Sequence, residues 1–273
     1  MLDARNVYRK VTRKIYDFSP EQLQNLTAIV WLFRGEKDRF LELVEAYLER
    51  TVTEALTTAA PIAQFERALT KLVDDMENVD ADIQAAAKTF EADRKAFEVF
   101  AKDGRRRWDG RKRDNKSLHK AADDIGPLSE ASRDLVKQMD QLYKIVEKLA
   151  KDSGQRGLNR PLKALEELRK EAVEQLKQVR YFYRQARWLQ SRFPDAELCD
   201  VEGLVKLVGH DEIAQNDWSL TPGRYVGVAP EEEDEDFDFE ETLRDIHIEL
   251  QGLSEEAGAL AAQIEKNFEE LGI

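Results

Sequence analysis

The sequence predicts an all-α protein with a long antiparallel coiled-coil or helical-hairpin arm on a small helical base. Three observations support this. Charged residues make up 36% of the 273-residue chain and aromatic residues only 8%, a balance typical of long helices that bury one apolar stripe. Apolar residues recur in steps of three and four over long stretches, as they do in helices. Polar segments with Gly or Pro separate these stretches.

The N-terminal part predicts two helices. Residues 5–14 are basic with alternating apolar residues, a pattern compatible with either a strand or a helix. Ser19 is then a suitable N-cap, Pro20 occupies the first helical position, and Gln22 completes a capping box. Gly35 is expected to end or bend this helix. A second amphipathic helix follows, with the stripe Phe40, Leu41, Val44, Tyr47 and Leu48.

The middle of the chain carries two heptad seams. The first runs from Ile62 to Phe100 and predicts one coiled-coil helix about 60 Å long. The segment Gly104–Lys116 interrupts it, and a second seam runs from Leu135 to Leu149. Gly126 and Pro127 are expected to break or kink the chain before the second seam. Arms of similar length around a polar turn predict an antiparallel helical hairpin.

The remaining chain predicts shorter elements. After a turn at Asp152–Pro161, a third helix is expected to end near Phe193, because Pro194 cannot continue it. Short helices are expected at Glu202–Val208 and Asp211–Gln215. One short extended element is expected near residues 218–228, around a type II turn at Pro222-Gly223.

The last part of the chain combines an acidic run with a clean heptad pattern. Residues 231–238 are nearly all acidic and are expected to form a solvated linker. The helix after it is expected to need a partner helix. Its subunit-interface candidates are Phe239, Leu243, Ile246, Leu250, Leu253, Leu260 and Ile264.

The expected organisation has five parts. They are an N-terminal helical segment (1–50), a coiled-coil arm (51–193), an irregular segment with the TPGRY turn (194–230), the acidic linker (231–238) and a C-terminal coiled-coil helix (239–273). The chain has no signal-peptide pattern and no stretch near the roughly 20 apolar residues of a membrane span. A soluble, cytoplasmic protein without a membrane partner is expected. The single cysteine, Cys199, excludes an intrachain disulfide and predicts a buried or inert thiol.

The sequence shows no catalytic constellation. It lacks a glycine-rich dinucleotide or phosphate loop, a zinc-protease motif and a nucleophile elbow. Its histidines, His119, His210 and His247, lie on three different predicted segments and have no metal-ligand spacing. No catalytic, cofactor or metal residue is assigned, and no activity is expected from this chain alone.

Charge nevertheless points to one candidate contact region. The net charge of −13 and the pI near 4.9 argue against a general nucleic-acid binder, but the basic charges are clustered. Arginine matches phosphate geometry and tryptophan stacks on bases. The DNA-contact candidates are Arg105, Arg106, Arg107, Trp108, Arg111, Lys112 and Arg113, together with Arg9 and Arg13 near the N-terminus. The alternative is a solvated loop that keeps the tip of the hairpin soluble.

Three stretches together resemble a known family. They are Arg5–Leu23 with Trp31–Glu36, Ser191–Leu198 with Val201–Val208, and Asp211–Val228 followed by the acidic run and the closing helix. Their order resembles the C-terminal region of the modification subunit of type I restriction-modification systems. The resemblance covers residues 5–50 and 191–273, and the third stretch is its most specific part.

The resemblance implies an adenine-N6 DNA methyltransferase that uses S-adenosylmethionine. A glycine-rich cofactor loop and an Asn-Pro-Pro-Phe-type motif carry that chemistry in the family, and neither is present here. No catalytic or cofactor residue is therefore carried over. The methyltransferase domain is absent, and Met1 directly before the match implies a truncated gene product, a split gene or an expressed fragment.

For this part of the subunit the resemblance implies assembly. The expected partners are the DNA specificity subunit, a separate methyltransferase domain or a restriction subunit, and DNA within the assembled complex. The C-terminal helix is the expected docking element. The alternative is a stand-alone coiled-coil scaffold that self-associates.

Overall fold

The computed structural model describes residues 1–10, 15–76, 81–109, 112, 114–229, 243, 250, 257, 258 and 260. The chain divides into two units, residues 1–227 and 228–273. In the described part, helices dominate and the sheet is a hairpin of two short strands. The all-α class is therefore confirmed. No helix among the described residues is long and apolar enough to cross a membrane.

The N-terminal segment forms a hairpin and then a capped helix. Strands β1 (Arg9–Lys10) and β2 (Tyr16–Asp17) pair antiparallel, so Arg9 and Lys10, within the segment left open between strand and helix, are in a strand. Helix α1 (Pro20–Phe33) begins as predicted: Ser19 Oγ accepts from the Gln22 amide at 3.1 Å, and the Gln22 side chain accepts from the Ser19 amide at 2.8 Å. The chain turns after α1 at Gly35, which has a φ of 75°, as glycine permits.

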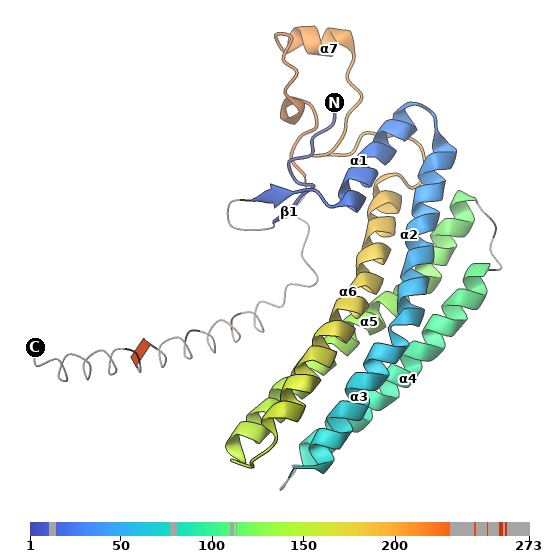
Figure 1. Ribbon diagram of the computed structural model, residues 1–273. Coiled ribbons are helices and arrows are strands. Elements are labelled where there is room, and N and C mark those ends of the chain that lie inside the picture. The colour runs from blue at the N-terminus through green and yellow to red at the C-terminus, as the bar shows by residue number, and fades with distance from the viewer. Residues whose placement is uncertain are drawn as a thin grey trace, which may run out of the picture. The chain divides into compact units, whose positions relative to one another are not determined.

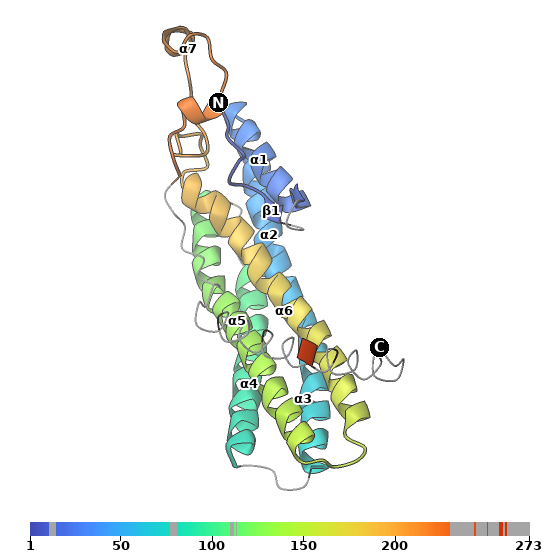
Figure 2. The same cartoon turned by 90° about the vertical axis from the view of Figure 1, so that its left-hand side faces the viewer.

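Five helices of residues 37–192 form an up-and-down bundle. Helices α2 (Lys37–Thr57) and α3 (Ala59–Asp74) run in line, α4 (Ala81–Asp109) returns beside them, and α5 (Asn115–Asp152) and α6 (Asn159–Arg192) complete the bundle (Figures 1 and 2). Helix α6 contacts α2, α3 and α5. It ends at Arg192, just before Phe193 and Pro194, as predicted.

The prediction of one continuous helix from Ile62 to Phe100 is wrong. The seam belongs to two antiparallel neighbours, α3 and α4, with Phe65 and Phe90 in edge contact at 5.8 Å between ring centroids. The apolar pattern hides the reversal because both helices bury their stripes in the same core. Their largest fully buried side chains include Ile62, Phe65, Leu69, Ile83, Phe90 and Phe97. Heptad spacing therefore did not reveal where the chain turns.

The interruption expected at Gly104–Lys116 is present but shorter than predicted, and the chain does not break at Gly126 and Pro127. Helix α4 continues through Gly104 to Asp109, and α5 begins at Asn115 and runs through Gly126 and Pro127. Ile125 and Leu128 beside this pair are buried, so packing of the inner face maintains the helix. Gly126 allows a close approach of α6, because a Cβ there would lie 3.0 Å from the Tyr183 hydroxyl.

One end of the bundle carries a small additional layer, residues 1–35 and 193–227, which we name the head region. The N-terminal residues join residues 201–206: the Asp3 amide donates to the Leu204 carbonyl at 2.8 Å, and Leu2 bridges Val205. The Gly203 amide in turn donates to the Val226 carbonyl at 2.5 Å. Three distant stretches are thus held together by backbone hydrogen bonds (Figure 1).

Predictions for the head region are partly confirmed. Helix α7 (His210–Gln215) is present where a short helix is expected. The helix expected at 202–208 is wrong, since this stretch forms turns and isolated bridges. The extended type II turn is also wrong, because residues 222–224 form the 3-10 helix η1 (Pro222–Arg224). A Cβ at Gly223 would require the Arg5 guanidinium to move.

In the second unit, Leu243, Leu250, Ala257, Gly258 and Leu260 are helical. The acidic run 231–238 lies outside the described residues. Helix α2 passes through the boundary expected between residues 50 and 51.

Candidate nucleic-acid interface

The last turn of α4 points its four candidate residues in different directions. Successive residues on a helix are separated by about 100° of rotation, so Arg105, Arg106, Arg107 and Trp108 cannot share one face. Each therefore meets a different environment, and the helix itself divides the basic cluster that the sequence indicates.

Arg105 faces α2. Its guanidinium contacts Glu49 at 2.5 Å and Asp109 at 2.9 Å. These carboxylates, Glu49 first, raise the pKa of Arg105 above its ordinary value. With two acidic partners, Arg105 stabilises the bundle and has little charge to offer to a phosphate.

Trp108 is buried, with 3% of its surface exposed. The expectation that it stacks on nucleic-acid bases is therefore wrong, because a base needs an accessible ring face. Its aromatic surface instead packs into the core beneath the turn. The apolar ring is more favourably placed away from water than at the solvent-exposed end of a helix.

Arg106 and Arg107 remain accessible. Their side chains are 79% and 65% exposed. Arg106 pairs with Asp103 on its own helix, and Arg107 reaches Asp124 of α5 at 3.6 Å. Exposed pairs of this kind are weak, so both guanidinium groups can exchange a carboxylate for a phosphate.

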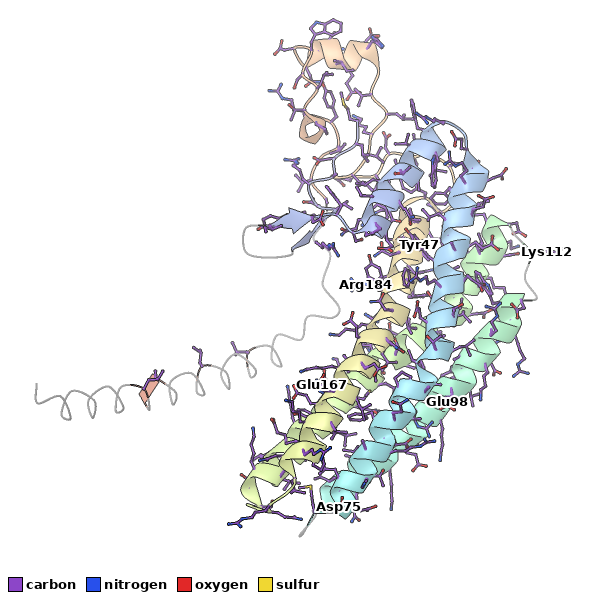
Figure 3. The ribbon with its side chains drawn as sticks, in the orientation of Figure 1. Tyr47, Asp75, Glu98, Lys112, Glu167 and Arg184 are labelled. Atoms are coloured by element: carbon purple, nitrogen blue, oxygen red, sulfur yellow. The ribbon has the colours of Figure 1, made fainter. Side chains whose placement is uncertain are left out.

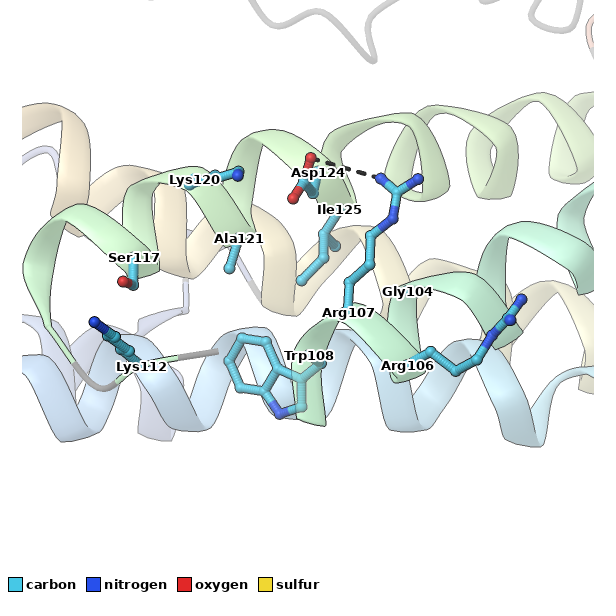
Figure 4. A pocket seen from close by; sticks show the side chains of 10 residues that line it. All are labelled: Gly104, Arg106, Arg107, Trp108, Lys112, Ser117, Lys120, Ala121, Asp124 and Ile125. Carbon is cyan, nitrogen blue, oxygen red and sulfur yellow. Dashed lines mark ion pairs between the residues drawn. The ribbon is translucent and has the colours of Figure 1, made fainter. Parts of the chain in front are cut away.

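The start of α5 lines a cavity together with the end of α4. Asp114 caps the helix by accepting from the Ser117 amide and the Ser117 hydroxyl, each at 2.9 Å. The hydrogen bond from the Ser117 amide has the largest effect on the pKa of the Asp114 carboxyl, and the bond from the Ser117 hydroxyl adds to it. Both hold that pKa below its ordinary value. This cap positions Ser117 and Lys120 on the first turns of α5, where both line a cavity with residues of α4 (Figure 4).

Together these groups form a basic cavity of about 510 Å³ between the ends of α4 and α5. Trp108, Ala121 and Ile125 supply apolar lining, and Asp124 is the single carboxylate of the lining (Figure 4). Its cationic lining residues are Arg106, Arg107, Lys112 and Lys120. Formal charge in the lining is thus strongly positive, in a chain that is acidic as a whole.

A second cavity lies on the other side of Trp108 and has the opposite character. It measures about 530 Å³ and is lined by Ala46, Arg105, Trp108 and the carboxylates Glu42, Glu45, Glu49 and Asp109. Because one cavity is basic and the other acidic, a polyanion has a favourable approach from the α5 side and an unfavourable one from the α2 side.

In the described part of the chain no cluster of acidic, cysteine or histidine side chains could hold a metal ion.

The basic cavity does not lie at a free hairpin tip. Asn115 Nδ2 donates to the Pro194 carbonyl at 2.7 Å, and His119 Nε2 lies 2.9 Å from the same oxygen. The α4–α5 turn is therefore beside the end of α6, at the head end of the bundle. Figure 3 places Lys112 near this end and Asp75 at the opposite one.

Of the remaining DNA-contact candidates, only Arg9 is among the described residues, and it is not at this cavity. Arg9 lies on β1 and pairs with Asp17 at 3.3 Å; the hairpin is on the side of the bundle away from the α4–α5 turn (Figure 1). Arg13, Arg111 and Arg113 lie outside the described residues. Arg9 is thus separate from the cavity.

The subunit-interface candidates are described in part. Leu243, Leu250 and Leu260 are helical and more than half exposed. Phe239, Ile246, Leu253 and Ile264 lie outside the described residues. The described members of the stripe therefore present apolar surface to solvent.

Cys199 is exposed rather than buried. Partial burial, together with Asp200 and Asp195, raises the pKa of its thiol. A raised pKa disfavours the thiolate, which is the nucleophilic form.

Comparison with known proteins gives two partial similarities. Over 73 residues the chain is 42% identical to the type I restriction enzyme HindI methylase subunit of Haemophilus influenzae, covering 27% of this chain and 16% of that protein. Over 70 residues it is 39% identical to the type I restriction enzyme MjaIX methylase subunit of Methanocaldococcus jannaschii, covering 26% and 12%. The matches thus span less than a fifth of these curated relatives. No family model and no solved structure matches the chain.

Three residues of the cavity were missed from the sequence. Ser117, Lys120 and Asp124 were not among the predicted contact residues, because the second seam was placed at Leu135–Leu149, after an expected break or kink at Gly126 and Pro127. The signal was present: Asp114 followed three residues later by Ser117 is a recognisable helix start. That cap places Lys120 in the first turns of a helix, where it lines the same cavity as Arg106 and Arg107.

Proposed function

We propose that this chain is a non-catalytic helical part of a type I restriction-modification methyltransferase, which docks on the specificity subunit and contacts DNA through the basic cavity. The observation that carries the proposal is the partial similarity to two type I methylase subunits, one bacterial and one archaeal. The chain contains none of the motifs of methyl transfer. Methylation in this proposal is performed by catalytic residues outside this chain.

Docking is assigned to the C-terminal stripe. Leu243, Leu250 and Leu260 present an exposed apolar face on helical residues. An isolated amphipathic helix is marginally stable in water and gains stability by burying that face against other helices. The specificity subunit is the proposed partner for this face.

DNA contact is assigned to the basic cavity. Arg106, Arg107, Lys112 and Lys120 line it, and such groups neutralise backbone phosphates without reading sequence. The carboxylates on the far side of Trp108 repel a phosphate backbone. The cavity would thus orient the DNA relative to the bundle, while target choice stays with the specificity subunit.

The alternative, a scaffold that self-associates through coiled-coil seams, is not favoured by the bundle. The seams of α3, α4, α5 and α6 are buried against one another, with Phe65, Phe97, Leu135 and Leu176 at most 1% exposed. Seams already buried inside one chain are not available to a second chain.

The test is co-purification with the specificity and methyltransferase proteins encoded beside this chain. We expect capture of the specificity subunit by the full chain and loss of capture when Leu250 is replaced by Asp. Val228→Asp is the matched control, since Val228 is also apolar and exposed but precedes the stripe. Failure of the full chain to bind the specificity subunit would overturn the proposal.

A further inference from the structure

Asp124 is the acidic member of an otherwise basic cavity. It carries the one negative charge among the described residues that line the cavity between α4 and α5, whose positive members are Arg106, Arg107, Lys112 and Lys120. Its carboxylate Oδ1 lies 3.6 Å from Nη1 of Arg107 (Figure 4). A site whose charges favour a polyanion thus also holds a group that opposes one.

Two adjacent aspartates of α5 have different partners. Successive residues of a helix are about 100° apart, so Asp123 and Asp124 leave α5 in different directions. Asp123 pairs with Arg187 of α6 at 3.1 Å and is absent from the lining of the cavity. Asp124 pairs with Arg107 of α4. The chain thus has, at neighbouring positions, one carboxylate at the cavity and one away from it.

The Arg107–Asp124 pair is easily exchanged. Its separation of 3.6 Å is longer than the roughly 2.7–2.9 Å of a charge-assisted hydrogen bond. The two side chains are 65% and 37% exposed, and ion pairs this exposed are weak. A guanidinium presents a planar set of donors that fits two oxygens of one phosphate. A phosphate is therefore a better partner for Arg107 than Asp124 is at this distance.

Packing of apolar side chains joins the two helices beside this pair. Trp108 of α4 and Ile125 of α5 are each 3% exposed and belong to the core. Burial of such side chains stabilises a bundle far more than an exposed ion pair does. The cavity should therefore keep its shape when the charge of Asp124 is removed.

We propose that Asp124 is an internal competitor for phosphate, whose carboxylate occupies the place beside Arg107 that a DNA phosphate takes on binding. This inference rests on the proposed function, since it concerns the cavity assigned to DNA contact. A phosphate must separate Arg107 from Asp124 and then remains near the negative charge of that carboxylate. Both effects lower the affinity. Asp124 thus keeps a sequence-independent contact weak, so that it does not dominate over the contacts that read the target.

The isosteric variant Asp124→Asn tests the proposal by removing the charge. Fluorescence anisotropy of a labelled DNA duplex with the full chain, at one low salt concentration, gives the Kd. We expect Asp124→Asn to tighten binding by about three- to tenfold, the effect of one unit charge close to a phosphate in water. Asp123→Asn is the matched control, with the same change in net charge one residue away, and should change the Kd by less than about twofold. Equal tightening by both variants would assign the effect to net charge and overturn the proposal.

A variant cycle with Arg107 tests whether Asp124 acts by occupying that arginine. In an Arg107→Ala background the group for which carboxylate and phosphate compete is gone, so Asp124→Asn should tighten binding much less than in the wild type. Equal gains in both backgrounds would show general repulsion in place of competition and would contradict the proposal. Thermal melts verify that each variant is folded.

Inorganic pyrophosphate, followed by isothermal titration calorimetry, separates this inference from the DNA contact. We expect the full chain to bind pyrophosphate more tightly after Asp124→Asn, and not after Asp123→Asn. If pyrophosphate shows this pattern while no variant binds the duplex, the DNA contact fails and the role of Asp124 stands. If the duplex is bound and Asp124→Asn leaves both affinities unchanged, the DNA contact stands and the role of Asp124 is wrong. A chain that binds neither probe, with or without the Asp124 carboxylate, overturns both.

Discussion

Arg105 of α4 donates to Glu49 of α2 across 2.5 Å and thereby joins the end of one bundle helix to another. Arg106 and Arg107, its neighbours in sequence, pair with Asp103 and Asp124 instead and stay well exposed. Three consecutive arginines therefore have two different roles, one in the bundle and one at the cavity.

Replacing Arg106 and Arg107 by Ala should weaken DNA binding by the assembled complex. Removing one interaction with a backbone phosphate reduces the slope of log affinity against log salt by about one, so we expect the slope of the double variant to fall by about two. Fluorescence anisotropy with a labelled duplex over a salt series measures it.

Arg105→Ala is the matched control for that experiment. It should leave the salt slope unchanged and cost roughly 0.2–1 kcal/mol of unfolding free energy, the usual value for a partly exposed ion pair. If Arg105→Ala changes the slope as much as the double variant does, the distinction between the two roles is wrong.

Trp108→Ala should destabilise the bundle by about 3–5 kcal/mol, the cost of truncating a buried aromatic side chain. Trp108→Phe keeps most of the packing and should lose less. Chemical denaturation followed by circular dichroism gives both values. A Trp108→Ala variant with wild-type stability and weaker binding to single-stranded DNA would restore the stacking interpretation.

Local signals in the sequence predicted the elements that local interactions determine. The capping box at Ser19 and Gln22, the turn at Gly35 and the stop before Pro194 depend on a few neighbouring residues, and all three are present. A helix start, a turn or a helix end that depends only on neighbouring residues can be identified from a single sequence.

Non-local relationships could not be predicted in this way. The chain reversal between α3 and α4 leaves the apolar period intact, because Phe65 and Phe90 face the same core from opposite directions. The burial of Trp108 depends on the packing of helices around it, and the cavity depends on Lys120 of one helix approaching Arg107 of another. Composition identified the basic segment; only the packing showed which of its charges remain accessible.

Asp3 should make the attachment of the N-terminal segment dependent on pH. The Arg5 side chain, through its hydrogen bonds, holds the pKa of Asp3 below its ordinary value of about 3.9. The pKa of the Asp3 carboxyl is therefore lower in the folded protein than in the unfolded chain. Such a carboxyl stabilises the folded state at pH values above its unfolded-state pKa, and this stabilisation is lost as the pH falls through its folded-state pKa. The stability difference between wild type and Asp3→Asn should therefore be present at neutral pH and vanish at pH values well below about 4.

Denaturant unfolding of both proteins at several pH values measures that difference. Arg5→Gln is the companion variant, since it removes the group that depresses the pKa and should produce a similar loss at neutral pH. A difference between wild type and Asp3→Asn that is constant down to strongly acidic pH would contradict the role assigned to the Asp3–Arg5 pair.

The last prediction concerns α5. Pro127 lies within this helix and has no amide hydrogen to donate to the carbonyl of Asp123, one turn earlier. Pro127→Ala restores a donor and a good helix former without disturbing the buried side chains of Ile125 and Leu128, and should stabilise the protein by about 1–3 kcal/mol. An unchanged or lower unfolding free energy would mean that the local helix geometry is adapted to proline.

Gly126→Ala is the comparison at the neighbouring position. Its gain in helix propensity of about 1 kcal/mol is opposed by the Tyr183 hydroxyl, 3.0 Å from the new Cβ. In a Tyr183→Phe background the obstructing oxygen is gone, so Gly126→Ala should be more stabilising there than in the wild type. The double-mutant cycle isolates this contact, and equal effects in both backgrounds would show that Tyr183 does not limit the residue at position 126.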